Sequence, residues 1–248
     1  MADTRGRAAP SAARMRSCSG AVSTPEQLRI LAALGAARPL VSATVGDLPL
    51  EAAALAAAIH ATTAVGVDIV KFGVFAGPGD ARRGLAELDQ ALRARPVALP
   101  LVAVLMADRI EDLDAACALA RQAMQVQGVA GVMLDTAVKG RRGGRLPDIF
   151  DAAKLQAFVA AVHGAGGYAG LAGSLRADDV PLLAQTRADL LGFRGALCLR
   201  GRTDVIDAAA FCRVRAQVLS AREARRPSAL ASNTNDADTC GAAAASSG

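Results

Sequence analysis

Short apolar stretches alternate with amphipathic or alanine-rich stretches through most of this chain. The apolar stretches are nearly continuous in Val, Ile and Leu, which is typical of parallel strands covered on both faces. They lie at residues 40–46, 69–75, 99–106, 131–138, 168–175 and 190–199. A helix is predicted after each strand, at 50–64, 79–94, 110–126, 151–165, 178–186 and 205–221. The pattern therefore predicts six consecutive βα units, as in a (β/α) barrel or a doubly wound sheet.

The six predicted βα units begin only at residue 40, and the segment before them is not accounted for. No G-x-G-x-x-G follows the first predicted strand, so a Rossmann dinucleotide site is not supported. Six units are too few to close a (β/α)8 barrel, and only one further amphipathic helix, at 21–37, precedes them. We expect a disordered or aberrant N-terminus at 1–20, a barrel-type catalytic domain at 21–221 and a disordered tail at 222–248.

Charge and composition exclude several classes of partner. The net charge is +5, but residues 21–199 hold seventeen charges of each sign, so the basic excess lies at the chain ends. A nucleic-acid site needs a basic face on the folded domain, and no such partner is predicted. No apolar run is long enough to span a bilayer. The five cysteines are widely spaced, without C-x-x-C, which favours a reduced, cytoplasmic protein without structural zinc.

Polar residues at the ends of predicted strands are the candidates for chemistry, because active sites of βα proteins lie there. Lys71 interrupts a buried strand, where a desolvated amine could act as a base or form a Schiff base. Its alternative role is a structural ion pair with Asp135 or Asp47. Asp135 itself ends a strand and either takes part in chemistry or closes the loop. Lys139 follows it in a Gly/Arg-rich loop, as a site residue or a solvated side chain.

A phosphate site is predicted after the last two strands. Gly173 and Ser174 end one strand, and Arg194 and Gly195 lie on the next. Small residues let backbone N–H groups face an anion, and an arginine adds positive charge. Barrels commonly bind phosphate at this position. The alternative is that these glycines only permit close packing.

Five of these segments resemble one known family, the (5-formylfuran-3-yl)methyl phosphate synthases. They are LVSATVGDLP, IVKFGVF, VMLDTAVKG, GLAGSL and LLGFRGALC, in this order within about residues 38–215. The resemblance implies a TIM (β/α)8 barrel that condenses two glyceraldehyde 3-phosphate molecules to a furfural phosphate, with loss of phosphate and water, in methanofuran biosynthesis. It also implies a lysine-based, aldolase-like carbon–oxygen lyase with a phosphorylated small-molecule substrate and no metal or organic cofactor.

The same resemblance assigns roles to individual residues. Lys71 corresponds to the family's proton acceptor, and Asp135 and Lys139 to its LDTA-x-K motif. By the resemblance, Gly173, Ser174, Arg194 and Gly195 would hold the substrate phosphate. Asp47, which follows the first predicted strand, is expected to bind substrate because of that position.

The chain departs from the family at its start. Members have two strands there, the second ending in a D-x-K-x-P motif whose lysine forms the Schiff base, whereas no lysine precedes Lys71 here. We expect a truncated or misread start, with the first two strands missing or altered. Two alternatives stay open. One is an inactive or phosphate-binding relative that could form a homo-oligomer through an open sheet edge; the other is a different Schiff-base aldolase.

Overall fold

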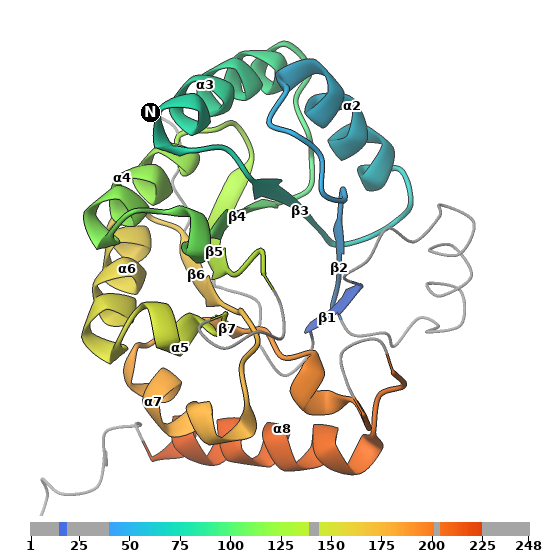
Figure 1. Cartoon of the computed structure of the whole chain (residues 1–248). Coiled ribbons are helices and arrows are strands. Elements are labelled where there is room, and N and C mark those ends of the chain that lie inside the picture. The colour runs from blue at the N-terminus through green and yellow to red at the C-terminus, as the bar shows by residue number, and fades with distance from the viewer. Residues whose placement is uncertain (1–14, 19–39, 139–143, 201–203, 225–248) are drawn as a thin grey trace, which may run out of the picture.

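A curved sheet of parallel strands, with helices around its outside, makes up the fold (Figure 1). The computed structural model describes residues 15–18, 40–138, 144–200 and 204–224. The strands are β1 (Met15–Cys18), β2 (Leu40–Thr44), β3 (Ile69–Val74), β4 (Leu101–Met106), β5 (Val129–Asp135), β6 (Tyr168–Leu171) and β7 (Leu190–Leu191). The α-helices are α2 (Ala52–Thr63), α3 (Pro78–Ala94), α4 (Leu113–Ala123), α5 (Leu146–Ile149), α6 (Ala152–Gly164), α7 (Val180–Gln185) and α8 (Ala208–Glu223). Single 3-10 turns are η2 (Ala107–Arg109), η3 (Ala177–Asp179) and η4 (Gly195–Leu197).

The order of the strands identifies the sheet as part of a barrel. Each strand is parallel to the next one along the chain, from β1 to β7, without a reversal of order. A doubly wound sheet would reverse its order at a switch point, so the predicted TIM-type barrel is confirmed. Among the described residues no pairing joins β7 to β1, and the barrel is therefore partial.

Strand β1 was missed by the sequence analysis, which found no strand before residue 40. It pairs with β2 in register, Met15 opposite Leu40 and Cys18 opposite Ala43. Its four residues, MRSC, contain no apolar run. A short edge strand can form without one, because its pairing depends on the backbone groups of the neighbouring strand more than on its own composition. The remainder of the predicted N-terminal segment 1–20 lies outside the described residues.

The last predicted strand is much shorter than expected. Only Leu190–Leu191 pair with β6, although the N–H of Gly192 still donates to the carbonyl of Leu171 at 2.8 Å. The backbone then leaves the extended conformation at Arg194, with φ −132° and ψ −66°, and η4 follows. At the other end, α8 continues to Glu223, slightly past the predicted start of the tail; residues 225–248 lie outside the described part.

The helices cover the outer face of the sheet with apolar side chains. Leu85, Leu88 and Leu92 of α3 are fully buried in the same core as Phe72 of β3. Each such side chain contributes about 1.5–3 kcal/mol when it leaves water. Since Phe72 faces the helices, its sequence neighbours on β3 face the inside of the curved sheet.

Candidate functional site

Lys71 faces the inside of the curved sheet. Its neighbours Val70 and Phe72 are completely buried in the core beneath the helices, while Lys71 is half-buried. Successive side chains of a strand point to opposite faces, so the amine lies on the interior face. In the register of the sheet, Lys71 is level with Thr44 of β2 and Val102 of β4. The predicted base is thus carried by a rigid strand in the middle of the sheet.

Asp135 lies on the same face, nearer to the carboxyl edge of the strands. It ends β5 opposite Met106, which comes after Val102 along β4. The N–H of Thr136 donates to Oδ1 of Asp135 at 2.7 Å. This bond fixes the half-buried carboxylate at the point where β5 becomes a loop. The sheet therefore brings Lys71 and Asp135 to one face, at two different depths.

Asp47 lies at the same edge, on the turn after β2. It is exposed and follows Gly46, whose φ of +94° favours glycine. The N–H of Val45 donates to the carbonyl of Lys71 at 3.0 Å, which continues the β2–β3 pairing to this turn. The Asp47 carboxylate is accordingly near the end of the lysine-bearing strand and open to solvent.

Gly173 and Ser174 form a turn in which both residues have positive φ, +109° and +51°. A Cβ at Gly173 would lie 2.9 Å from Cγ2 of Thr136 and 3.1 Å from Cβ of Leu146. The Gly173 carbonyl also accepts the N–H of Leu146 at 3.0 Å. Only glycine permits this approach, which packs the loop after β6 against the loop after β5.

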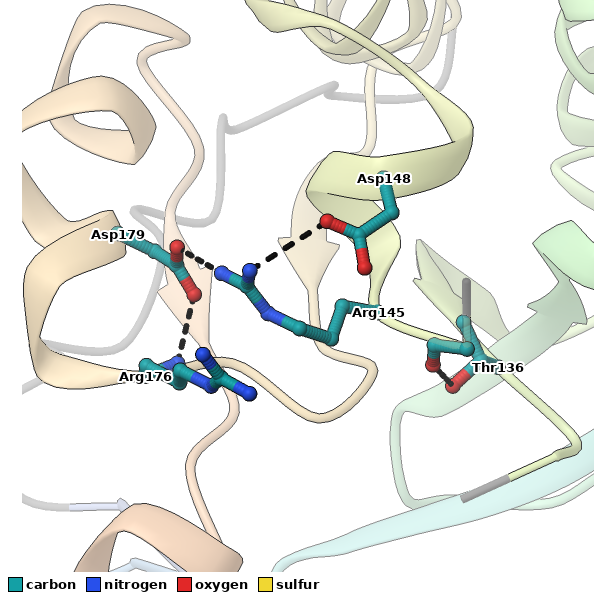
Figure 2. Close-up of polar contacts among 6 residues, drawn as sticks. Thr136, Arg145, Asp148, Arg176 and Asp179 are labelled. Carbon is teal, nitrogen blue, oxygen red and sulfur yellow. Dashed lines mark hydrogen bonds and ion pairs between the residues drawn. The ribbon is translucent and has the colours of Figure 1, made fainter. Parts of the chain in front are cut away.

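Arg145 strengthens this contact between loops, and the sequence analysis did not identify it. Its guanidinium forms an ion pair with Asp179 of η3 and a second one, at 3.4 Å, with Asp148 of α5 (Figure 2). Asp179 also accepts the N–H of Arg176 at 2.7 Å. The hydrogen bond that Arg145 donates to the Asp179 carboxylate raises the pKa of the guanidinium. Arg145 and Asp179 are 34 residues apart, so no local sequence pattern predicts that they pair.

Arg194 and Gly195 lie on the neighbouring loop, after β7. Both are exposed, and Gly195 begins η4. Because β7 pairs with β6 in parallel, their carboxyl ends lie at the same edge of the sheet. The two predicted halves of the phosphate site, Gly173–Ser174 and Arg194–Gly195, therefore come from adjacent loops.

Further hydrogen bonds fix the start of the loop after β5. Thr136 donates its hydroxyl to the carbonyl of Gly144 at 3.0 Å, and the N–H groups of Ala137 and Val138 both donate to Asp108 of η2. Lys139, the remaining predicted site residue, lies outside the described residues. Asp108 was also missed, since its partners Ala137 and Val138 lie 29 and 30 residues away, after the neighbouring strand.

Within the described ranges, no three side chains of His, Cys, Asp or Glu are grouped so that they could hold a metal ion. None of the helices described is long and apolar enough to cross a membrane.

Three named relatives align with about two thirds of this chain. A protein of Methanopyrus kandleri named (5-formylfuran-3-yl)methyl phosphate synthase is 37% identical, over 65% of this chain and 68% of its own length. One of the same name from Methanococcus maripaludis strain C6 is 32% identical, over 65% and 69%. A protein of Methylorubrum extorquens, which has the name provisionally, is 39% identical, over 70% and 66%. The matches span about two thirds of these relatives' lengths.

Solved structures agree with the fold. A 3-hexulose-6-phosphate synthase superposes with a TM-score of 0.53 and 20% identity, over 83% of this chain and 87% of its own. The deoxyribose phosphate aldolase of Aeropyrum pernix gives a TM-score of 0.50 at 13% identity, over 73% and 86%. These likenesses concern the fold alone. The family model described as 4-HFC-P synthase matches residues 19–215, from before β2 into α8. With that match over most of the chain, and the strand order of the barrel beneath it, this chain belongs to the 4-HFC-P synthase family.

Proposed function

We propose that this chain is a (5-formylfuran-3-yl)methyl phosphate synthase. It would join two molecules of glyceraldehyde 3-phosphate, with loss of phosphate and water, to give a furfural phosphate. The observation that carries this proposal is the family match over residues 19–215. In this assignment the chain is an aldolase-like carbon–oxygen lyase that acts in the cytoplasm on a phosphorylated small molecule.

Lys71 is the proposed proton acceptor. Its half-buried place on a central strand, with buried apolar residues before and after it, supports this role. A side chain on a strand is held more precisely than one on a loop, and proton transfer requires the acceptor within hydrogen-bond reach of the proton. Asp135, fixed by the N–H of Thr136 at the end of β5, would orient the substrate nearer the barrel mouth, together with Lys139.

The loops after β6 and β7 are proposed to hold the substrate phosphate. The Gly173–Ser174 turn follows β6, at the edge of the sheet where the loop after β7 also begins. The exposed guanidinium of Arg194 lies on the adjacent loop, and a planar guanidinium matches the geometry of phosphate oxygens. A triose phosphate held there by its phosphate would extend its aldehyde towards the interior face that carries Lys71.

The covalent step needs a lysine amine. Lys154 lies on the exposed face of α6, so we propose that Lys71 or Lys139 forms the imine. The amine would attack the aldehyde carbon, water would leave, and a later attack of water on the imine would release the amine. Asp135, on the same interior face but four residues further towards the mouth than the level of Lys71, is proposed to shuttle protons at the substrate carbonyl.

The test is product formation and trapping of the imine. The protein would be incubated with glyceraldehyde 3-phosphate, with and without borohydride, and the furfural phosphate and the modified peptide identified by mass spectrometry. Lys71→Met should lower kcat by about 100- to 10,000-fold, the usual contribution of a positioned proton acceptor or nucleophile. Lys154→Met on the exposed face of α6 is the matched control and should stay within about twofold. Neither product nor adduct from the unsubstituted protein would contradict the proposal.

A further inference from the structure

Asp108 binds the start of the loop that follows β5. It lies in η2, directly after β4. Its Oδ1 accepts the N–H of Ala137 and its Oδ2 accepts the N–H of Val138, each at 2.7 Å. Hydrogen bonds to an ionised carboxylate are roughly twice as strong as neutral ones. One side chain thus fixes two successive peptide groups immediately after the Asp135–Thr136 segment.

Arg109 makes the corresponding contact on the other side of β4. Its Nη1 donates to the carbonyl of Phe75 at 3.1 Å, and its guanidinium lies over the Phe75 ring, 5.7 Å from the centroid. Phe75 is the first residue after β3, the strand that carries Lys71. The ring in turn covers Gly73, where a Cβ would collide with it. Arg109 is therefore anchored to the carboxyl end of the lysine strand.

We propose that Asp108 and Arg109 are positioning residues that hold the ends of β3 and β5 at a fixed separation, and with them Lys71 and Asp135. This inference rests on the proposed function of those two residues. Because Asp108 and Arg109 are adjacent on one rigid turn, their contacts connect the two strand ends through β4. Catalytic groups need to be held within about 0.5 Å, and a misplacement of about 1 Å can lower a rate 100-fold.

The contacts differ from those that merely stabilise a helix end. Asp112, four residues later, caps its own helix by accepting the N–H of Ala115 at 2.8 Å. Asp108 has both oxygens on residues 29 and 30 positions away instead. Both bonds join residues that are far apart in the sequence. They therefore fix the position of the loop after β5 and do not cap η2.

The first experiment compares Asp108→Asn with Asp112→Asn in the full chain. Asparagine has one acceptor where the carboxylate has two, so one of the two N–H groups loses its partner, whereas Asn caps a helix about as well as Asp. With glyceraldehyde 3-phosphate, D108N should lower kcat about 10- to 100-fold and change KM less than about threefold. D112N should leave both within about twofold. A kcat within twofold in D108N, or a loss of kcat that only follows the unfolded fraction at the assay temperature, would overturn the inference.

Amide hydrogen exchange separates this inference from the proposed function. D108N should speed the exchange of at least one of the Ala137 and Val138 amides, the one left without an acceptor, at least about tenfold while those of β4 stay protected. Arg109→Met should loosen the end of β3 at Phe75, and Arg83→Met, which breaks an exposed pair on α3, should not. Unchanged exchange at 137 and 138 would overturn the inference whether or not the protein makes a furan. Absence of furan from the unsubstituted protein, with exchange as expected, would instead count against the proposed function.

Discussion

The guanidinium of Arg145 pairs with the carboxylate of Asp179, and this pair connects the loop after β5 to the loop after β6 (Figure 2). Both side chains are less than one quarter exposed. Asp179 also accepts the N–H of Arg176, so the carboxylate serves the ion pair and the start of η3 together. The Gly173–Ser174 turn contacts the residue next to Arg145, because Gly173 accepts the N–H of Leu146.

Removing one partner of this pair should cost more than an ordinary surface substitution. Arg145→Met keeps much of the apolar stem but leaves the Asp179 charge partly buried, which we expect to lower the free energy of unfolding by about 1–3 kcal/mol. The measurement is urea unfolding of Arg145→Met, Asp179→Asn and the double variant. A coupling of about 1 kcal/mol or more is expected between the two positions.

A matched control for this pair exists on α3. The Arg83–Asp80 pair has similar chemistry, but both side chains are more than 70% exposed. Arg83→Met should change the free energy of unfolding by less than about 0.5 kcal/mol. A coupling near zero between Arg145 and Asp179 would contradict their role in joining the two loops.

Gly173→Ala should disturb both stability and phosphate binding. The residue has φ +109°, and the new methyl group would meet Thr136 at 2.9 Å and Leu146 at 3.1 Å. We expect a loss of about 1–3 kcal/mol in the free energy of unfolding, and a rise in KM for the triose phosphate that exceeds the change in kcat. Gly164→Ala, at the end of α6 with open space around the site, should be neutral or slightly stabilising. Equal effects of the two substitutions would show that the Gly173 turn is not needed.

The barrel could be predicted from the sequence because its signal is local and repeated. Near-continuous apolar stretches such as 69–75 and 99–106 identify strands that are covered on both faces, and β3 and β4 lie within them. The strand predictions were wrong at the two ends of the sheet. β1 has no apolar run, and β7 has only two paired residues although its predicted stretch covers ten. Edge pairing depends on backbone groups of the neighbouring strand, which composition does not record.

The candidate site was predictable where a residue contradicts its surroundings. Lys71 stands out because it is a cation within a buried strand, and Asp135 because it ends one. Arg145 gives no such signal, since it lies in a polar stretch where charged residues are expected, and Asp108, although it follows the predicted strand at 99–106, is one of several charged residues there. Their partners are 34 and about 30 residues away, and the pairing depends on how two loops meet once the strands are in register. Such contacts follow from tertiary structure, and sequence periodicity cannot reveal them.

Asp89 gives a prediction for acid solution, away from the barrel mouth. Its Oδ2 accepts Nε of Arg93 at 2.6 Å and its Oδ1 accepts the N–H of Gln127 at 2.8 Å, which joins α3 to the segment before β5. The hydrogen bond from Arg93 lowers the pKa of Asp89 below its ordinary value. A carboxyl group with a lowered pKa in the folded state stabilises the fold above its unfolded pKa, and this contribution disappears as the pH falls through the folded pKa.

Asp89→Asn should therefore lower the free energy of unfolding at neutral pH, by about 1 kcal/mol for the weakened hydrogen bonds. The difference between the original protein and the variant should shrink as the pH falls from about 5 towards and below the ordinary aspartate range near 3.8. Urea unfolding at a series of pH values measures both proteins under the same conditions, so the other carboxylates cancel in the difference. A difference that stays constant between pH 7 and about pH 3 would mean that the ionisation of Asp89 contributes nothing to the free energy of unfolding.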